Sequence, residues 1–225
     1  MTAYFVTSTG TDIGKTFVTA GLIRHLREAH AQVDALKPVV SGFDIATAAV
    51  SDPGVLLEAL DEPITPEALD RISPWRFSAP LSPDMAAARE RRAVPYDEVV
   101  SFCTKAIAKN KGTLFIEGVG GVMVPLDENR TVLDWMVALD LPVIVVTGTY
   151  LGTISHTLTA LEVLKRAGVR VAALVLNDSG DGAVPIAETR RTVARFAPQI
   201  PLAEIRRVKS YVAARAEFAK LASLL

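Results

Sequence analysis

The chain has 225 residues, half of them hydrophobic and 22% of them charged, and its 24 basic and 25 acidic residues leave a net charge of −1. This composition provides one sizeable core and excludes an intrinsically disordered chain. It provides no basic field for nucleic acid, so no nucleic-acid partner is predicted.

The single cysteine, Cys103, cannot form an internal disulfide, and it lies in a segment of helical period where a small buried residue is expected. The N-terminal segment lacks the basic start and long apolar centre of a signal peptide. No apolar run reaches the ~18–20 residues that span a membrane. The sequence therefore predicts a cytoplasmic protein with no membrane partner.

Short β-branched runs alternate with segments of helical period along the chain. The predicted strands are nearly continuous apolar runs, as in a parallel sheet covered on both faces, at residues 3–7, 33–36, 113–117, 142–147 and 169–176. The predicted helices span residues 15–29, 53–60, 95–109, 132–139, 153–167, 187–196 and 210–224. This alternation predicts one doubly wound α/β domain over residues 1–225, with a mostly parallel sheet and helices on both faces. Ligands of such folds bind outside the carboxyl ends of the strands.

Between the first strand and the first helix, residues 8–16 read Ser-Thr-Gly-Thr-Asp-Ile-Gly-Lys-Thr. Glycines let backbone N–H groups turn toward phosphate oxygens, and the following helix directs its positive end to the same place. Lys15 reaches the outer phosphates and the Thr16 hydroxyl can ligate Mg²⁺. The loop is a variant phosphate loop, because its first glycine is Gly10 rather than residue 9. The expected fold is therefore of the P-loop NTPase type.

Two further strands end in polar residues. Lys37 follows the second strand and is either a group that stabilises transferred charge or a solvated loop lysine. Glu117 ends the strand 113–117 and is followed by Gly118, Gly120 and Gly121, which allow close backbone approach to a ligand. A carboxylate at this place resembles the acidic Mg²⁺ partner of phosphate-loop proteins. Strand-end acids also act as helix caps, although no helix follows directly here.

Two other segments have alternative interpretations. Asp52 precedes Pro53 at the start of a predicted helix, so it is either a metal ligand or a helix N-cap. Residues 148–156 connect a strand to a helix and could hold an anion at the helix N-terminus, or Thr153 could simply cap that helix. The proline-rich segment 61–83 has no clear period and is expected to be an excursion beside the sheet, either a lid or a packed connection.

Taken together, several sequence blocks resemble dethiobiotin synthetase over roughly the first four-fifths of the chain. These blocks are residues 7–16, 37–42, 79–83, 117–122, 141–146 and 174–178. The family is a homodimeric, ATP-dependent ligase that forms C–N bonds. It closes a cyclic urea on 7,8-diaminopelargonate with CO₂ and releases ADP and phosphate. The resemblance thus implies small-molecule substrates, ATP as co-substrate, Mg²⁺ as cofactor and a site at a subunit interface.

The resemblance also implies roles for individual residues. The implied catalytic residues are Thr11, Lys15 and Lys37, and the implied Mg²⁺ ligands are Thr16, Asp52 and Glu117. The implied nucleotide-binding residues are Asp12, Ile13, Gly14, Lys15, Thr16, Phe17, Glu117, Gly118, Gly120 and Asn177, of which Asn177 reads the adenine edge. The implied substrate-binding residues are Lys37, Ser41, Pro80 and Val119, with Tyr150, Leu151, Gly152 and Ser155 from the neighbouring subunit, where they receive the substrate carboxylate.

The chain departs from the family pattern at a few positions. Ser8 stands where glycine is usual, Asp12 where glutamate is common, and Asp84 where histidine is usual. Residues 201–208 contain Arg206 and Arg207 in place of the usual Gly before an Ile-Pro-like turn.

Two other classes share features of this sequence. A nucleotide-dependent switch of the chromosome-partition kind shares the fold, but such switches usually carry a lysine near the start of the phosphate loop. A corrinoid amide ligase needs an added glutaminase domain, for which 225 residues leave no room.

Overall fold

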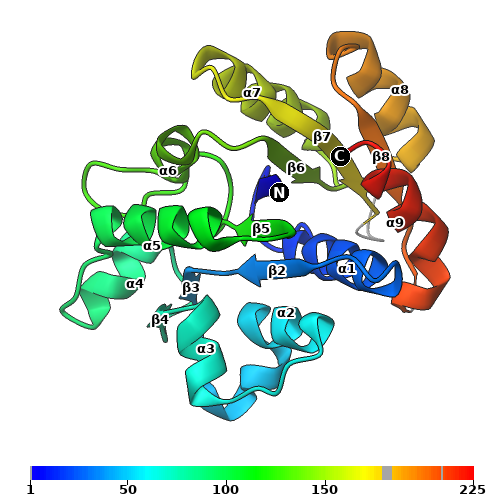
Figure 1. The fold of residues 1–225 in the computed structure, drawn as a ribbon. Coiled ribbons are helices and arrows are strands. Elements are labelled where there is room, and N and C mark those ends of the chain that lie inside the picture. Colours follow the sequence, from blue (N-terminus) through cyan, green and yellow to red (C-terminus); the bar gives the residue numbers. More distant parts are fainter. Residues whose placement is uncertain (1, 179–183, 209) are drawn as a thin grey trace.

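The computed structural model describes residues 2–178, 184–208 and 210–225. Six strands form one parallel sheet in the order β2-β5-β1-β6-β7-β8 (Figure 1). Their bounds are β1 Thr2–Ser8, β2 Val33–Leu36, β5 Thr113–Glu117, β6 Val143–Thr147, β7 Val171–Asn177 and β8 Leu202–Ile205. The first strand is central, and its Phe5 and Val6 side chains are fully buried. The predicted parallel α/β fold is confirmed.

Helices cover the sheet in two groups. α1 (Lys15–Glu28) packs against α2 (Asp52–Leu60) and α9 (Arg215–Ala222). The other group pairs α5 (Tyr96–Lys109) with α6 (Val132–Leu139), and α7 (Thr153–Arg166) with α8 (Ile186–Phe196). The crossover from β1 to β2 runs toward one edge of the sheet, whereas the crossovers from β5 to β6, β7 and β8 run toward the other edge. Because such crossovers are right-handed, the helices of the two sets lie on opposite faces of the sheet.

The segment beyond β2 is more structured than its sequence suggests. It contains β3 (Val39–Ser41), the 3₁₀ helix η1 (Ile45–Val50), α3 (Pro66–Ile72), β4 (Trp75–Phe77) and α4 (Pro83–Arg89), and β3 and β4 pair in a second small sheet. Leu69, Ile72 and Phe77 are buried. Residues 61–83 therefore form a packed connection at the β2 end of the molecule, next to α2 (Figure 1).

The C-terminal segment is divided into η2 (Tyr211–Ala214) and α9, rather than forming one helix over residues 210–224. Phe218 of α9 is fully buried against α1, where a Cβ atom on Gly21 would lie 1.9 Å from the Phe218 ring. A glycine is thus required at this helix contact. Among the described residues, no helix is long and apolar enough to cross a membrane.

Candidate active site

The loop between β1 and α1 has the backbone shape that a phosphate loop requires. Gly14 adopts φ 97° at the N-cap of α1, and Asp12 adopts φ 56°. The Asn177 side-chain amide, at the end of β7, donates to the Ile13 carbonyl oxygen at 2.8 Å, and a Cβ atom on Gly14 would lie 2.3 Å from Asn177 Nδ2. Only glycine fits both the conformation and the space at Gly14. Since no side chain caps this end of α1 within the described chain, its first N–H groups are available to an anion.

Lys37 is held by oxygen atoms from three segments. Its Nζ atom lies 2.7 Å from Glu117 Oε1, 2.8 Å from Asp52 Oδ2 and 2.8 Å from the Gly118 carbonyl oxygen. Both Lys37 and Glu117 are buried. The interpretation of Lys37 as a solvated lysine is therefore wrong, and all three ammonium protons have acceptors.

Burial and charge act on the two lysines of the site differently. Burial lowers the pKa of Lys15 to about 8, and the nearby Lys37 ammonium acts in the same direction. Burial also disfavours the charged form of Lys37, but attraction to Asp52 and Glu117 outweighs it and raises the Lys37 pKa. The Lys37 ammonium holds the pKa of Asp52 at about 2. Lys37 is thus a fixed cation between two carboxylates.

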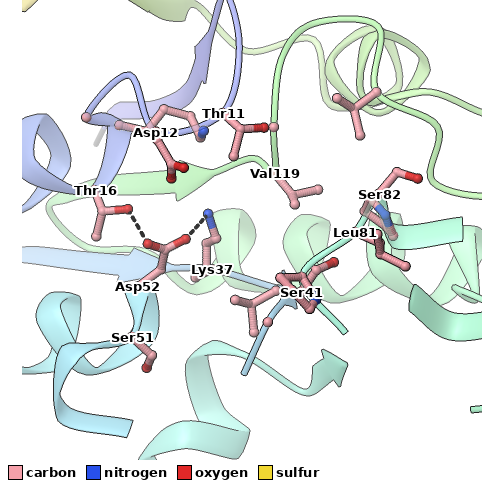
Figure 2. Close-up of a pocket in the computed structure, with 18 of the residues that line it drawn as sticks. Thr11, Asp12, Thr16, Lys37, Ser41, Ser51, Asp52, Leu81, Ser82 and Val119 are labelled. Carbon is pink, nitrogen blue, oxygen red and sulfur yellow. Dashed lines mark hydrogen bonds and ion pairs between the residues drawn. The ribbon is translucent and has the colours of Figure 1, made fainter. Parts of the chain in front are cut away.

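Asp52 is free to face this cluster because another residue caps its helix. The Ser51 hydroxyl accepts from the Gly54 N–H at 3.3 Å and is the N-cap of α2. The interpretation of Asp52 as the N-cap is wrong, since Asp52 is the first helical residue. Figure 2 shows its carboxylate between Thr16 and Lys37.

The residues predicted to hold Mg²⁺ converge. Thr16 Oγ1 lies 2.7 Å from Asp52 Oδ1 and 2.8 Å from Glu117 Oε1, although a hydroxyl can donate to only one of them. Glu117 Oε2 is buried and has no hydrogen-bond partner among the described residues. A hydroxyl and two carboxylates are oxygen ligands suited to Mg²⁺, and one carboxylate oxygen still lacks a partner. The donor set therefore fits a hard divalent cation. The cluster contains only two carboxylates, Asp52 and Glu117, and the described residues contain no group of three or more His, Cys, Asp or Glu side chains that could hold a metal.

Thr16, Lys37 and Asp52 border a cavity of about 720 Å³ (Figure 2). Many of the predicted site residues line it: Thr11, Asp12, Gly14, Lys15, Thr16, Lys37, Ser41, Asp52, Pro80, Val119 and Gly120. The Ser41 hydroxyl is buried there without a hydrogen-bond partner in the described structure. The cavity thus joins a phosphate loop, a cation cluster and a buried hydroxyl in one space.

Some lining residues were not predicted from the sequence. They are mainly apolar or small: Val40, Gly42, Val50, Ser51, Leu81, Ser82, Pro83 and Val124. An apolar residue such as Val40, Val50 or Val124 is usually interpreted as part of the core, so its type does not indicate a site. Residues 81–83 belong to the block 79–83 that carries the family resemblance. Their place in that block is the signal that could have assigned them to the site.

Other predicted residues do not line this cavity. The Phe17 ring packs edge-on against Phe218, with centroids 5.7 Å apart, and its contact with nucleotide stays a prediction. Glu117 and Gly118 meet the site through Lys37, and Ile13 and Asn177 meet it through the phosphate loop. Tyr150, Leu151, Gly152 and Ser155 lie before and within the first turn of α7.

The start of α7 is arranged differently from a threonine-capped helix. Its N-cap is Gly152, at φ 94° and without a side-chain cap, whereas the Thr153 hydroxyl donates to the Gly148 carbonyl oxygen at 2.8 Å. The alternative in which Thr153 caps the helix is therefore wrong. The Tyr150 hydroxyl pairs with His156 Nδ1 at 2.8 Å, and the Leu151 side chain is exposed.

Comparisons with known proteins agree with this geometry. Residues 2–215 match a family model described as an AAA domain. The chain is 48% identical over 202 residues to the ATP-dependent dethiobiotin synthetase BioD of Acidiphilium cryptum, covering 89% of this chain and 91% of the relative. It is 50% identical over 203 residues to the protein of the same name from Caulobacter sp. strain K31, covering 90% and 86%. The fold also resembles the cell division ATPase MinD of Pyrococcus furiosus, with a TM-score of 0.58, 17% identity and full coverage of both chains.

Proposed function

We propose, since this chain belongs to the family of ATP-dependent dethiobiotin synthetases, that it is a C–N bond-forming ligase that closes the cyclic urea of dethiobiotin. Its substrates are 7,8-diaminopelargonate, CO₂ and ATP, and ADP and phosphate leave. The proposal assigns the enzyme to the cytoplasm.

One observation carries this proposal. Lys15, Thr16, Lys37 and Asp52 border a single cavity beside the phosphate loop. Glu117 lies behind them and contacts Thr16 and Lys37. A reaction that collects a carbamate, a triphosphate and a divalent cation in one place needs cations and polar donors arranged in this way.

The reaction has three balanced steps. One substrate amine adds to CO₂, loses a proton to solvent and forms a carbamate. A carbamate oxygen attacks the γ-phosphorus of ATP, and ADP leaves as the phosphorus–oxygen bond to it breaks. The second amine then attacks the carbonyl carbon of the mixed anhydride and loses a proton, the bond from that carbon to the phosphate oxygen breaks, phosphate leaves, and the ring closes. Each step before closure gathers negative charge, so the protein acts chiefly by positioning and electrostatic stabilisation.

The residues have distinct roles in this scheme. Lys15, Thr11 and the N–H groups at Gly14 and Asp12 hold the outer phosphates. Lys37 lines the cavity and offsets the charge on the transferred phosphoryl group, and the Ser41 hydroxyl, which has no partner in the described structure, donates to the carbamate. Neither role needs a covalent nucleophile.

Thr16, Asp52 and Glu117 would hold Mg²⁺, and the buried, unpartnered Glu117 Oε2 atom supports this assignment. When bound, the cation would neutralise phosphate charge and orient the γ-phosphate. Asn177 would read the adenine edge from the end of β7, beside the phosphate loop.

A homodimer would account for the predicted residues near the start of α7, which lie outside the cavity. The N-terminus of α7 would receive the substrate carboxylate of the neighbouring subunit through Tyr150, Leu151, Gly152 and Ser155. Large apolar side chains are exposed in the segments that follow β5 and β6, namely Met123, Val137 and Leu151. Contact with a second copy of the chain would remove the apolar surface of these side chains from water.

The test is phosphate release from Mg·ATP with and without 7,8-diaminopelargonate and bicarbonate, with the product identified by mass. We expect release to need both additions and to yield the cyclic urea. A nucleotide-dependent switch would instead hydrolyse ATP without either addition. Release that is independent of the diamine, with no urea formed, would refute the proposal.

A further inference from the structure

We infer that Ser8 is a positioning residue for the phosphate-loop lysine, and that it joins this loop to the glycine segment after β5. The inference rests on the proposed function, because it concerns how the same site grips ATP. Ser8 ends β1, is fully buried, and does not line the cavity. It therefore acts through its neighbours and not by touching substrate.

The Ser8 hydroxyl uses its full hydrogen-bonding capacity within the site. It accepts from Lys15 Nζ at 3.3 Å and from the Gly10 N–H at 3.4 Å. Its single proton is shared between the carbonyl oxygens of Gly10 and Gly120, the latter at 3.1 Å. A hydroxyl has one proton and two lone pairs, so the proton and both lone pairs of Ser8 Oγ are engaged in hydrogen bonds.

The contact to Lys15 fixes the direction of an otherwise mobile group. Lys15 is buried. Among the described residues, the Lys15 ammonium donates a hydrogen bond to the Ser8 hydroxyl. Since an ammonium has three protons, one is taken by Ser8 and two remain for phosphate oxygens. Anchoring one proton therefore sets the direction of the other two before ATP arrives, which lowers the entropic cost of binding.

The contact to Gly120 links two loops that the sequence separates by more than one hundred residues. Gly121 lies directly against the phosphate loop, because a Cβ atom there would be 3.3 Å from the Gly10 nitrogen and from the Ser8 carbonyl oxygen. Val119 and Gly120 line the same cavity as Lys15. The Ser8 hydroxyl thus fixes the spacing between the phosphate side and the substrate side of the cavity.

The experiment compares Ser8→Ala and Ser8→Gly with the wild type, and glycine is the residue that the resemblance leads us to expect at this position. Thr7→Val is the matched control, because the neighbouring Thr7 hydroxyl is buried on the same strand without a partner in the described structure. We expect both Ser8 variants to raise the KM for ATP and the Kd for Mg·ADP about tenfold, or ~1.4 kcal/mol, with kcat changed less than threefold. Thr7→Val should change neither constant.

A double-mutant cycle separates positioning from a merely structural role. Urea unfolding of wild type, Ser8→Ala, Lys15→Met and the double variant is measured without nucleotide. We expect Ser8→Ala to lower the unfolding midpoint less when Lys15 is already methionine. Additive midpoints, or an unchanged Kd for Mg·ADP in both Ser8 variants, would overturn the inference. Wild-type protein that makes no cyclic urea would refute the proposed function instead, and the cycle and the ADP affinities would still decide the role of Ser8.

Discussion

Replacing Lys37 with methionine should destabilise the protein when divalent cations are absent. The change keeps the aliphatic stem but removes the ammonium that contacts Glu117 and Asp52 at 2.7 and 2.8 Å. Leaving a buried charge without its partner typically costs ~3–5 kcal/mol. Glu117 is fully buried, whereas the Asp52 side chain is 40% exposed and partly screened by water, so we use the lower value of about 3 kcal/mol. For a chain of this size that corresponds to a fall in Tm of roughly 6–12 °C.

The assay is thermal unfolding in EDTA and again with Mg²⁺. Since Lys37 and Mg²⁺ would neutralise the same carboxylates, Mg²⁺ should raise the Tm of Lys37→Met more than that of the wild type. A cation at about one hundred times its Kd stabilises by ~2.7 kcal/mol, which would recover most of the loss. Lys105→Met, on an exposed position of α5, is the control and should not change the Tm. An unchanged Tm for Lys37→Met in EDTA, or equal Mg²⁺ shifts in both proteins, would refute this reasoning.

Three other substitutions and one labelling experiment test separate parts of the structure. Ser41→Ala should lower kcat about tenfold without changing the Tm, because its buried hydroxyl has no hydrogen-bond partner in the described residues, and a lower Tm would contradict this. Gly21→Ala should lower the free energy of unfolding by ~1–3 kcal/mol in urea, because the new Cβ atom would lie 1.9 Å from the Phe218 ring, and an unchanged midpoint would argue against that contact. Burial raises the pKa of Cys103 to about 12, so at pH 8.5 a thiol reagent should label it only in urea, and rapid labelling of the native protein would be inconsistent with its burial. Leu151→Asp should convert a dimer to a monomer in sedimentation and abolish urea formation, whereas a dimer of unchanged activity would exclude this side chain from the interface.

The central elements could be predicted from the sequence because their signals are local. The runs 33–36 and 113–117 are short and mostly apolar, and β2 and β5 have these bounds. The edge strand β8 (Leu202–Ile205) was missed because residues 201–208 were interpreted by their resemblance to a turn of the family pattern. Helix α3 was missed because prolines obscure its period, although Thr65 caps it and Pro66 begins it.

In the site, too, features with local sequence signals could be predicted and features that depend on distant residues could not. The phosphate loop is continuous in sequence and could be predicted residue by residue. The role of Asp52 could not be predicted, because in a Ser-Asp-Pro segment either Ser51 or Asp52 can be the helix N-cap. Only the structure shows that Ser51 is the N-cap. The burial of Lys37 was also unpredictable, because its partners Glu117 and Gly118 are 80 and 81 residues away. Composition cannot show which charges a fold brings together.

The central position of β1 has a consequence for how the chain is made. β1 is made before the other strands of the sheet, but its two neighbours are β5 and β6, which begin at Thr113 and Val143. At about 5–20 residues per second, the strand Thr2–Ser8 waits on the order of ten seconds for its first neighbour. During that time an apolar strand with two unpaired edges is exposed to other nascent chains. Pairing of β1 therefore waits until β5 has been made, and chaperone dependence should be greatest for chains stalled between β2 and β5.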